Sequence, residues 1–135
     1  MNEIDRLLRE EQIARGGAFI QGVTVDEYLN KIKKHAEILV HFIEGQCAGF
    51  AAFYCNDPLK EQAFITLVLV APHFRGRNVA IALLEGVICL ARARGFANCQ
   101  LEVDADNEAA LQLYAKLGFK VMLKRAARSR LIKIL

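Results

Sequence analysis

The segment PHFRGRNVA, residues 72–80, joins an apolar run to a helical pattern and contains residue types that bind phosphate. The first turn of a helix leaves backbone N–H groups unpaired and has partial positive charge, so it can bind a diphosphate. Arg75 and Arg77 add charge there. The chain contains neither GxxxxGK[ST] nor GxGxxG, which excludes two other phosphate-binding motifs. Taken alone, the segment is equally compatible with an ordinary turn that carries two solvated arginines.

A second segment, residues 101–119, has an asparagine and a tyrosine that could both act on a bound ligand. Asn107 precedes a helical pattern and is a good N-cap residue. Tyr114 follows two turns later, and a phenol can donate a proton. The alternatives are a cap with no other role for Asn107 and a half-buried aromatic with a solvated hydroxyl for Tyr114.

Together the two segments resemble the GNAT N-acetyltransferase superfamily. The first is similar to its acetyl-CoA signature, a strand ending in V-x-P followed by R-G-x-G-x-A, here Val70, Pro72, Arg75, Gly76 and Ala80. The second is similar to its Asn-x-x-Ala helix, which ends in Tyr and Gly-Phe, here Asn107, Ala110, Tyr114, Gly118 and Phe119. The resemblance covers about residues 37–119, and one signature glycine is replaced by Asn78. Asparagine tolerates a left-handed backbone, so we expect the turn to survive this change.

The resemblance implies an enzyme that transfers an acetyl group from acetyl-CoA to an amine by direct attack, without a covalent enzyme intermediate. By position, main-chain groups would hold the diphosphate at Arg75, Gly76, Arg77, Asn78, Val79 and Ala80. Leu69 and Val70 would face the pantetheine and the acetyl carbonyl, and Asn107 would approach the cofactor. Tyr114 matches the proton donor for the departing thiolate and would also contact the cofactor. A CoA-binding protein without catalysis is the alternative function.

The general base is left unassigned, with Glu102 and Asp104 as candidates by strand position. Asp57, Glu61 and Glu102 would suit a cationic acceptor, which we expect to be a small-molecule or peptide amine. No metal is expected, because the three histidines share no ligand spacing: His35, His41 and His73. The cysteines form no CxxC pair and are expected to be mainly buried thiols in a reducing compartment: Cys47, Cys55, Cys89 and Cys99.

Apolar periodicity and turn residues indicate the elements that must position these groups. Helices are predicted at 4–14, 25–35, from 79 to near Gly95, and at about 107–117. Strands are predicted at 37–43, 47–55, 63–71 and 99–103, with two more within 119–135. Since a strand-helix-strand crossover is right-handed, strands 63–71 and 99–103 should run parallel and open at the same edge.

These elements predict an α/β fold of the GNAT type: a mixed, twisted sheet with helices on both faces. With 135 residues, 54% of them hydrophobic, the chain should form one domain over 1–135. Only Phe19 and Ile20 hint at a strand before residue 37, so the family's first strand is expected to be short or missing. An open sheet edge would follow, which either a partner chain or the N-terminal helix would have to cover, and we expect a homodimer.

Charge and hydropathy narrow the location and the partners. The net charge is +3, and the basic residues after position 123 lack interleaved aromatics, so no nucleic-acid partner is expected. The first residues, MNEIDRLLREEQ, are charged, and no apolar stretch approaches the roughly 18 residues of a membrane span. The expected location is cytoplasmic, with no membrane partner.

Overall fold

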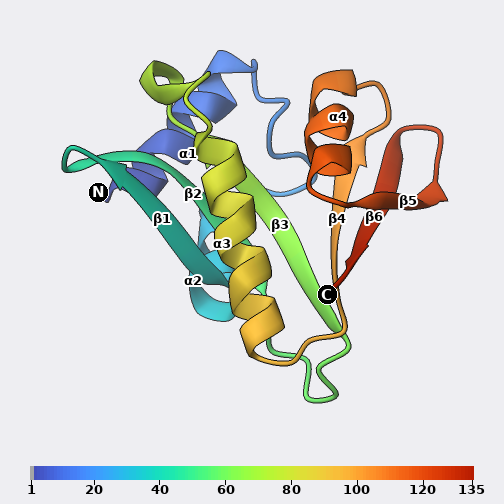
Figure 1. Ribbon diagram of the computed structural model, residues 1–135. Coiled ribbons are helices and arrows are strands. Elements are labelled where there is room, and N and C mark those ends of the chain that lie inside the picture. The colour runs from blue at the N-terminus through green and yellow to red at the C-terminus, as the bar shows by residue number, and fades with distance from the viewer. Residues whose placement is uncertain (1) are drawn as a thin grey trace.

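The computed structural model describes residues 2–135, in which six strands form one sheet and α-helices flank it (Figure 1). The helices are α1 (Glu3–Ala14), α2 (Val25–His35), α3 (Val79–Ala93) and α4 (Glu108–Lys116), with a 3-10 turn at Pro72–Phe74. The strands are β1 (Glu37–Ile43), β2 (Gln46–Tyr54), β3 (Gln62–Val70), β4 (Asn98–Asp104), β5 (Lys120–Lys124) and β6 (Arg128–Ile134).

The sheet has the strand order β1-β2-β3-β4-β6-β5, so β3 and β4 are its central pair. These two strands run parallel and all other neighbours run antiparallel, which confirms the crossover predicted for β3, α3 and β4. Over residues 2–36 the structure has helices and turns without a strand. The first strand expected of the family is therefore missing from the described residues, and β1 forms one edge of the sheet.

Local sequence explains most element boundaries. The Thr24 hydroxyl accepts a hydrogen bond from the Glu27 amide at 3.1 Å and caps α2, whose first turn is acidic and last turn basic. Glu44 and Gly45 both have positive φ, 49° and 78°, as a two-residue hairpin turn requires. The predicted connection between β1 and β2 was one residue too long, because Gln46 already pairs with Ile43.

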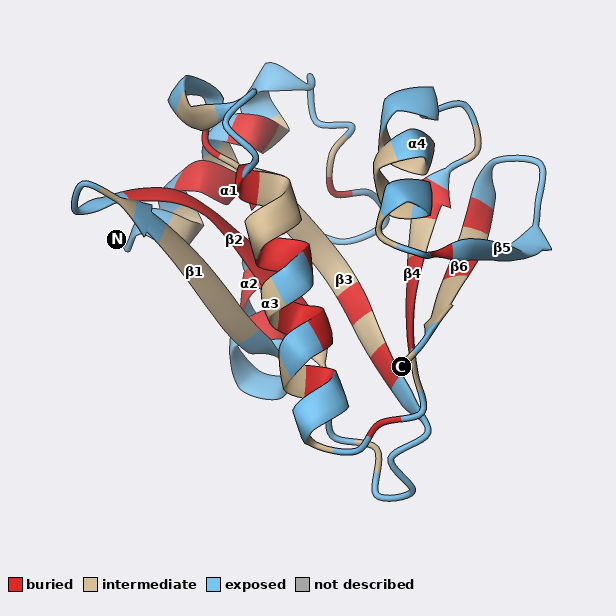
Figure 2. Ribbon diagram, in the orientation of Figure 1, coloured by how far each residue is buried: buried red, intermediate tan, exposed pale blue. Residues whose placement is uncertain are grey.

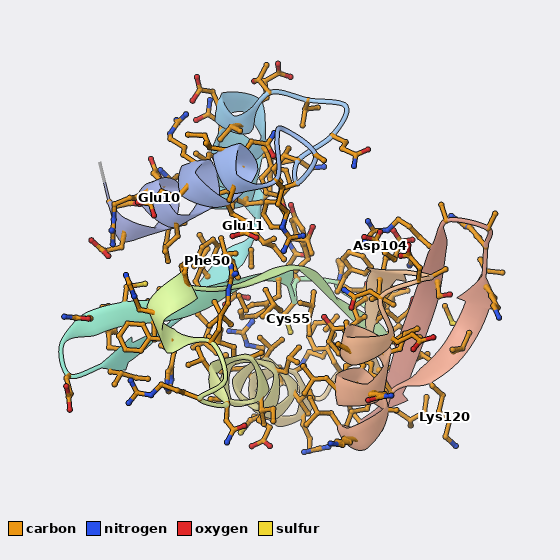
Figure 3. All side chains as sticks on the ribbon, turned by 90° about the horizontal axis from the view of Figure 1, so that it is seen from above. Glu10, Glu11, Phe50, Cys55, Asp104 and Lys120 are labelled. Carbon is orange, nitrogen blue, oxygen red and sulfur yellow. The ribbon has the colours of Figure 1, made fainter. Side chains whose placement is uncertain are left out.

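Helices cover both faces of the sheet, and each face has its own core (Figures 2 and 3). Between the sheet and α3 lie Phe53, Leu83, Leu84 and Val87, while Leu8, Ile32 and Phe50 fill the space under α1 and α2. Each of these side chains is at most 1% exposed. Burying a side chain of this size contributes about 1.5–3 kcal/mol, so α1 and α2 are integral to the fold.

A β-bulge in β3 decides which side chains face which core. Ala52 pairs with Leu67 and Phe53 with Ile65, so Thr66 is the extra residue. Before the bulge Ile65 faces α3, and after it Leu69 faces α1 and α2 while Val70 lies on the α3 side. A regular strand would have placed Leu69 with Ile65, because side chains alternate with period two.

Three of the four cysteines are buried: Cys47, Cys55 and Cys99, whereas Cys89 is exposed. Burial raises the pKa of the Cys99 thiol to about 12, with a smaller contribution from Cys55, so it stays protonated.

No helix in residues 2–135 combines the length and apolarity needed to cross a bilayer.

Candidate functional site

The two central strands separate towards their C-terminal ends. They pair from Gln62 with Asn98 to Ile65 with Leu101, and the pairing stops at the bulge. Beyond that point β3 continues to Val70 and β4 to Asp104. The bulge bends β3 away from β4, and a V-shaped opening results between two strands of one sheet.

The hydrogen-bond pattern of β3 shows which amides face this opening. The Ala71 N–H donates to the Ala48 carbonyl at 2.8 Å, and antiparallel pairs alternate between bonded and unbonded. The main-chain groups of Leu69 therefore face β2, and those of Val68 and Val70 face the opening. Of the two strand residues predicted to contact the acyl chain, only Val70 directs its N–H there.

A cavity of about 510 Å³ lies between this opening, the start of α3 and α4. It contains most of the residues predicted to bind the cofactor: Val70, Arg75, Gly76, Asn78, Val79, Ala80 and Asn107. Sequence reasoning missed four others in its wall: Phe74, Ile81, Ala109 and Leu113. Leu69, Arg77 and Tyr114 do not line it. The structure thus brings together two segments that lie about thirty residues apart in the chain.

The start of α3 leaves its first N–H groups without a side-chain cap. Gly76 and Asn78 have φ of 78° and 60°, so Asn78 adopts the left-handed conformation for which a glycine is usual. Asn78 makes no side-chain cap hydrogen bond. In contrast, the Asn107 side chain accepts from the Ala110 amide at 3.1 Å and caps α4. An uncapped start of a 15-residue helix suits an anion.

The two arginines of the turn make contacts that the sequence did not indicate. The guanidinium of Arg75 donates to a carboxylate oxygen of Glu11 on α1 at 2.8 Å, and its side chain is half exposed. Arg77 lies over the ring of Phe74, 5.4 Å from its centroid. Both arginine side chains therefore already have a partner in the protein. An arginine has five N–H donors, however, and Arg75 uses only one of them on Glu11.

Tyr114 is half-buried and lies on the same face of α4 as Asn107, seven residues further along. Its ring makes an edge contact with Phe119, with the centroids 5.9 Å apart. Burial raises the pKa of the Tyr114 phenol, and the positive charge of Arg128 partly opposes this. The hydroxyl therefore stays protonated at neutral pH, as a proton donor must.

The carboxylates proposed as bases are engaged elsewhere. Arg130 contacts Glu102 at 3.1 Å, and Arg128 contacts Asp104 at 3.3 Å. Both carboxylates are thus held in ion pairs with arginines of β6, so neither is favoured for proton removal. Asp57 accepts main-chain hydrogen bonds within the β2–β3 loop, at the opposite end of β3 from Val70, and Glu61 lies in the same loop. Those two cannot reach an acceptor at the opening.

Residues 3–119 match the family model described as the acetyltransferase (GNAT) family. The chain belongs to this family. It is 35% identical to an uncharacterised N-acetyltransferase of Methanocaldococcus jannaschii over 82 residues. This match covers 58% of this chain and 36% of that protein. It is also 35% identical to the ribosomal protein bS18-alanine N-acetyltransferase of Escherichia coli over 83 residues. This second match covers 62% of this chain and 56% of that protein.

Among solved structures, the fold is similar to that of the PaiA N-acetyltransferase from Thermoplasma acidophilum in complex with coenzyme A. The TM-score is 0.76 at 18% identity, covering 97% of this chain and 90% of that one. This likeness confirms the predicted GNAT fold with helices on both faces of a mixed sheet. The matched parts of the two curated relatives make up 36% and 56% of their own lengths.

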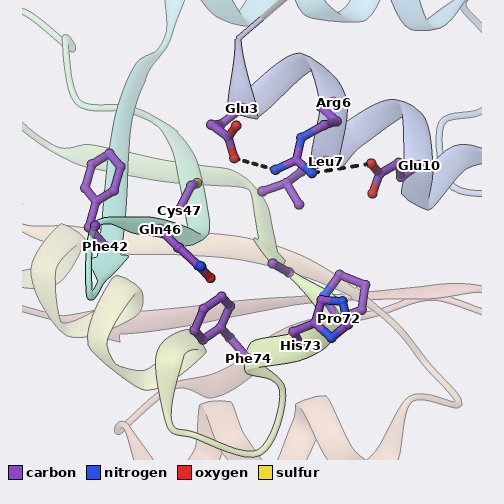
Figure 4. A pocket seen from close by; sticks show the side chains of 12 residues that line it. Glu3, Arg6, Leu7, Glu10, Phe42, Gln46, Cys47, Pro72, His73 and Phe74 are labelled. Carbon is purple, nitrogen blue, oxygen red and sulfur yellow. Dashed lines mark hydrogen bonds and ion pairs between the residues drawn. The ribbon is translucent and has the colours of Figure 1, made fainter.

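A larger hollow of about 710 Å³ lies on the other side of the Pro72–Phe74 turn (Figure 4). Ion pairs of Arg6 with Glu3 and Glu10 line it, together with the β1–β2 turn. None of the GNAT signature residues from Arg75 to Ala80 is in its wall. Its size alone therefore does not make it the cofactor site.

Residues 2–135 contain no cluster of three His, Cys, Asp or Glu side chains suited to a metal.

A smaller hollow of about 240 Å³ lies on the α2 side of the opening. The α1–α2 connection, α2, the bulged part of β3 and β6 all contribute: Phe19, Ile20, Gln21, Tyr28, Thr66, Leu67 and Arg128. Burial raises the pKa of the Tyr28 phenol, and a hydrogen bond with Thr66 opposes the shift. No local motif identified this hollow, because its residues come from four separate parts of the chain.

Asn78→Gly should raise the free energy of unfolding by about 0.5 kcal/mol, because glycine adopts the left-handed conformation without a Cβ penalty. Urea denaturation of the two proteins measures the difference. Gly76→Ala should lower the free energy of unfolding, because it puts a Cβ on a residue with φ of 78°. No atom lies within 4 Å of that Cβ, so the effect comes from the backbone conformation alone. A loss of stability in Asn78→Gly would show that the Asn78 side chain contributes more than its backbone conformation costs.

Proposed function

We propose that this protein transfers an acetyl group from acetyl-CoA to a primary amine. One observation carries the proposal: residues of both signature segments surround one cavity, at the uncapped start of α3 and beside the free amide of Val70. The names of the curated relatives, which are N-acetyltransferases, and the coenzyme A bound to the PaiA structure support the same cosubstrate.

The geometry supports a direct transfer. The diphosphate would bind the N–H groups at the start of α3, which directs the pantetheine into the opening between β3 and β4. A neutral amine attacks the thioester carbonyl, and the Val70 N–H donates a hydrogen bond to the oxyanion. When the carbon–sulfur bond breaks, the thiolate takes a proton from Tyr114. The amine nitrogen loses one proton to water, and Tyr114 is reprotonated by solvent.

The acceptor would approach from the opposite face, through the hollow beside Thr66. Its volume of about 240 Å³ suits a group the size of one amino-acid residue, either a small-molecule amine or the end of a peptide. The Escherichia coli relative is named for acetylating an alanine of a ribosomal protein, which supports a peptide amine. The buried thiols fit a reducing cytoplasm.

A homodimer is part of the proposal, because β1 leaves an edge of main-chain groups unpaired within the described residues. A second copy could pair along this edge by a twofold axis. A monomeric mass in solution at micromolar concentration would contradict this part alone.

Calorimetry with CoA and acetyl-CoA tests the cofactor site, and release of free thiol with a panel of amines tests the transfer. Both ligands should bind, and at least one amine class should release CoA above the hydrolysis rate. Absence of CoA binding would refute the proposal. Binding without any transfer would leave the alternative, a CoA-binding protein without catalysis.

A further inference from the structure

Glu11 is the one buried carboxylate of α1, and its side chain is 6% exposed. It lies between α1 and the sheet (Figure 3). One carboxylate oxygen accepts from Arg75 at 2.8 Å, and the other accepts from Arg15 at 2.6 Å. A carboxylate with two arginine partners is a fixed negative charge, since the two guanidinium groups compensate its burial.

The two arginines lead to different sites. Arg75 lines the cavity at the start of α3. Arg15 lies over the ring of Phe19, 4.7 Å from its centroid, and Phe19 lines the hollow on the α2 side of the opening. Phe19, Arg15, Glu11 and Arg75 thus form a continuous series of contacts between the two hollows on either side of β3.

We propose that Glu11 is a positioning residue for acetyl transfer: through Arg75 it holds the diphosphate-binding turn, and through Arg15 it holds the α1–α2 connection beside the acceptor. The proposal rests on the function proposed above. A phosphate that contacts the remaining N–H donors of Arg75 restricts the motion of the guanidinium. Because Glu11 bonds to both arginines, it then also restricts the motion of Arg15 and of Phe19 beneath it. Cofactor binding would then order the wall of the acceptor hollow.

The first test is the affinity for CoA, measured by calorimetry. Glu11→Gln keeps the shape of the side chain but removes its charge, and we expect CoA to bind about tenfold more weakly because a charge-assisted hydrogen bond to Arg75 is lost. Glu10→Gln is the matched control: it is the neighbouring glutamate of the same helix, half exposed and paired at 3.7 Å with Arg6. The control should bind CoA like the unmodified protein.

A double-mutant cycle separates positioning through Arg75 from a general loss of stability. If Glu11 acts through Arg75, adding Glu11→Gln to Arg75→Gln should change CoA affinity less than twofold. A further tenfold loss in the double variant would contradict the proposal, as would an unchanged or tighter affinity in Glu11→Gln alone. CoA binding by the unmodified protein, with no effect of Glu11→Gln, would overturn this inference and leave the proposed function intact.

The second test is amide hydrogen exchange of residues 16–21 with and without saturating CoA. In the unmodified protein CoA should slow exchange there, although this segment lies outside the cofactor cavity. Arg15→Gln removes the contacts of Arg15 with Glu11 and Phe19 but leaves the ion pair of Glu11 with Arg75 in place. It should abolish the slowing, and it remains informative if Glu11→Gln does not fold. Equal slowing in Arg15→Gln, or none in the unmodified protein, would show that the two hollows are not connected through Glu11.

Discussion

Tyr114→Phe should lower the rate of acetyl transfer by about 10²-fold or more and change the affinity for CoA less than twofold. The phenol is half-buried on α4, on the same face as the cap residue Asn107, and burial raises its pKa, so it stays protonated at neutral pH. A positioned proton donor contributes roughly 10²–10⁴ in rate. Phenylalanine keeps the edge contact with Phe119 and removes only the hydroxyl.

Free thiol release under saturating acetyl-CoA, with whichever amine the panel identifies, measures this effect. Tyr54→Phe on β2 is the matched control, because Tyr54 is also half-buried but lies outside the site. The pH profile adds a second criterion: the unmodified enzyme should keep its rate on the alkaline side until above about pH 10, the ordinary value for tyrosine, because the Tyr114 pKa is raised. An unchanged rate in Tyr114→Phe would exclude Tyr114 as the donor.

Gly49→Ala should lower the free energy of unfolding by about 3 kcal/mol, a large effect for one methyl group. Gly49 lies on β2 directly opposite Val70. An added Cβ would lie 2.6 Å from the Leu69 carbonyl oxygen, 3.1 Å from the Val70 Cα and 3.3 Å from a methyl carbon of Val79. The nearest two are backbone atoms, which cannot rotate aside, so β3 itself must move. That movement shifts the Val70 amide and the start of α3 together.

Gly86→Ala on α3 provides the control, because its added Cβ would also approach an atom to 2.6 Å. That atom is the end of the Leu39 side chain, which can change rotamer, and alanine gains about 1 kcal/mol over glycine in a helix. Its net effect on urea denaturation should therefore be much smaller. If both variants are equally stable, the close approach of β2 to β3 does not hold the Val70 amide in place.

Local signals in the sequence determined the elements and most of the cofactor cavity. The boundaries of α2 and β1 follow from a capping threonine, graded charge and a run of β-forming residues, and all of these act between near neighbours. The crossover from β3 through α3 to β4 has only one favoured hand. It therefore brings Val70, Asn78 and Asn107 to one place, although Asn78 and Asn107 belong to separate motifs.

Only the tertiary structure decided how the two sides of the site are built. Residues 63–71 are apolar almost throughout, so no alternation could reveal the bulge at Thr66 or show that Val70 rather than Leu69 faces the opening. The partner of Arg75 is 64 residues away, and Arg130 is 28 residues from Glu102. Ion pairs between distant segments depend on packing, which leaves no recognisable pattern in the sequence. Helix caps and strand propensities do leave a pattern, because they depend on interactions between near neighbours in the chain.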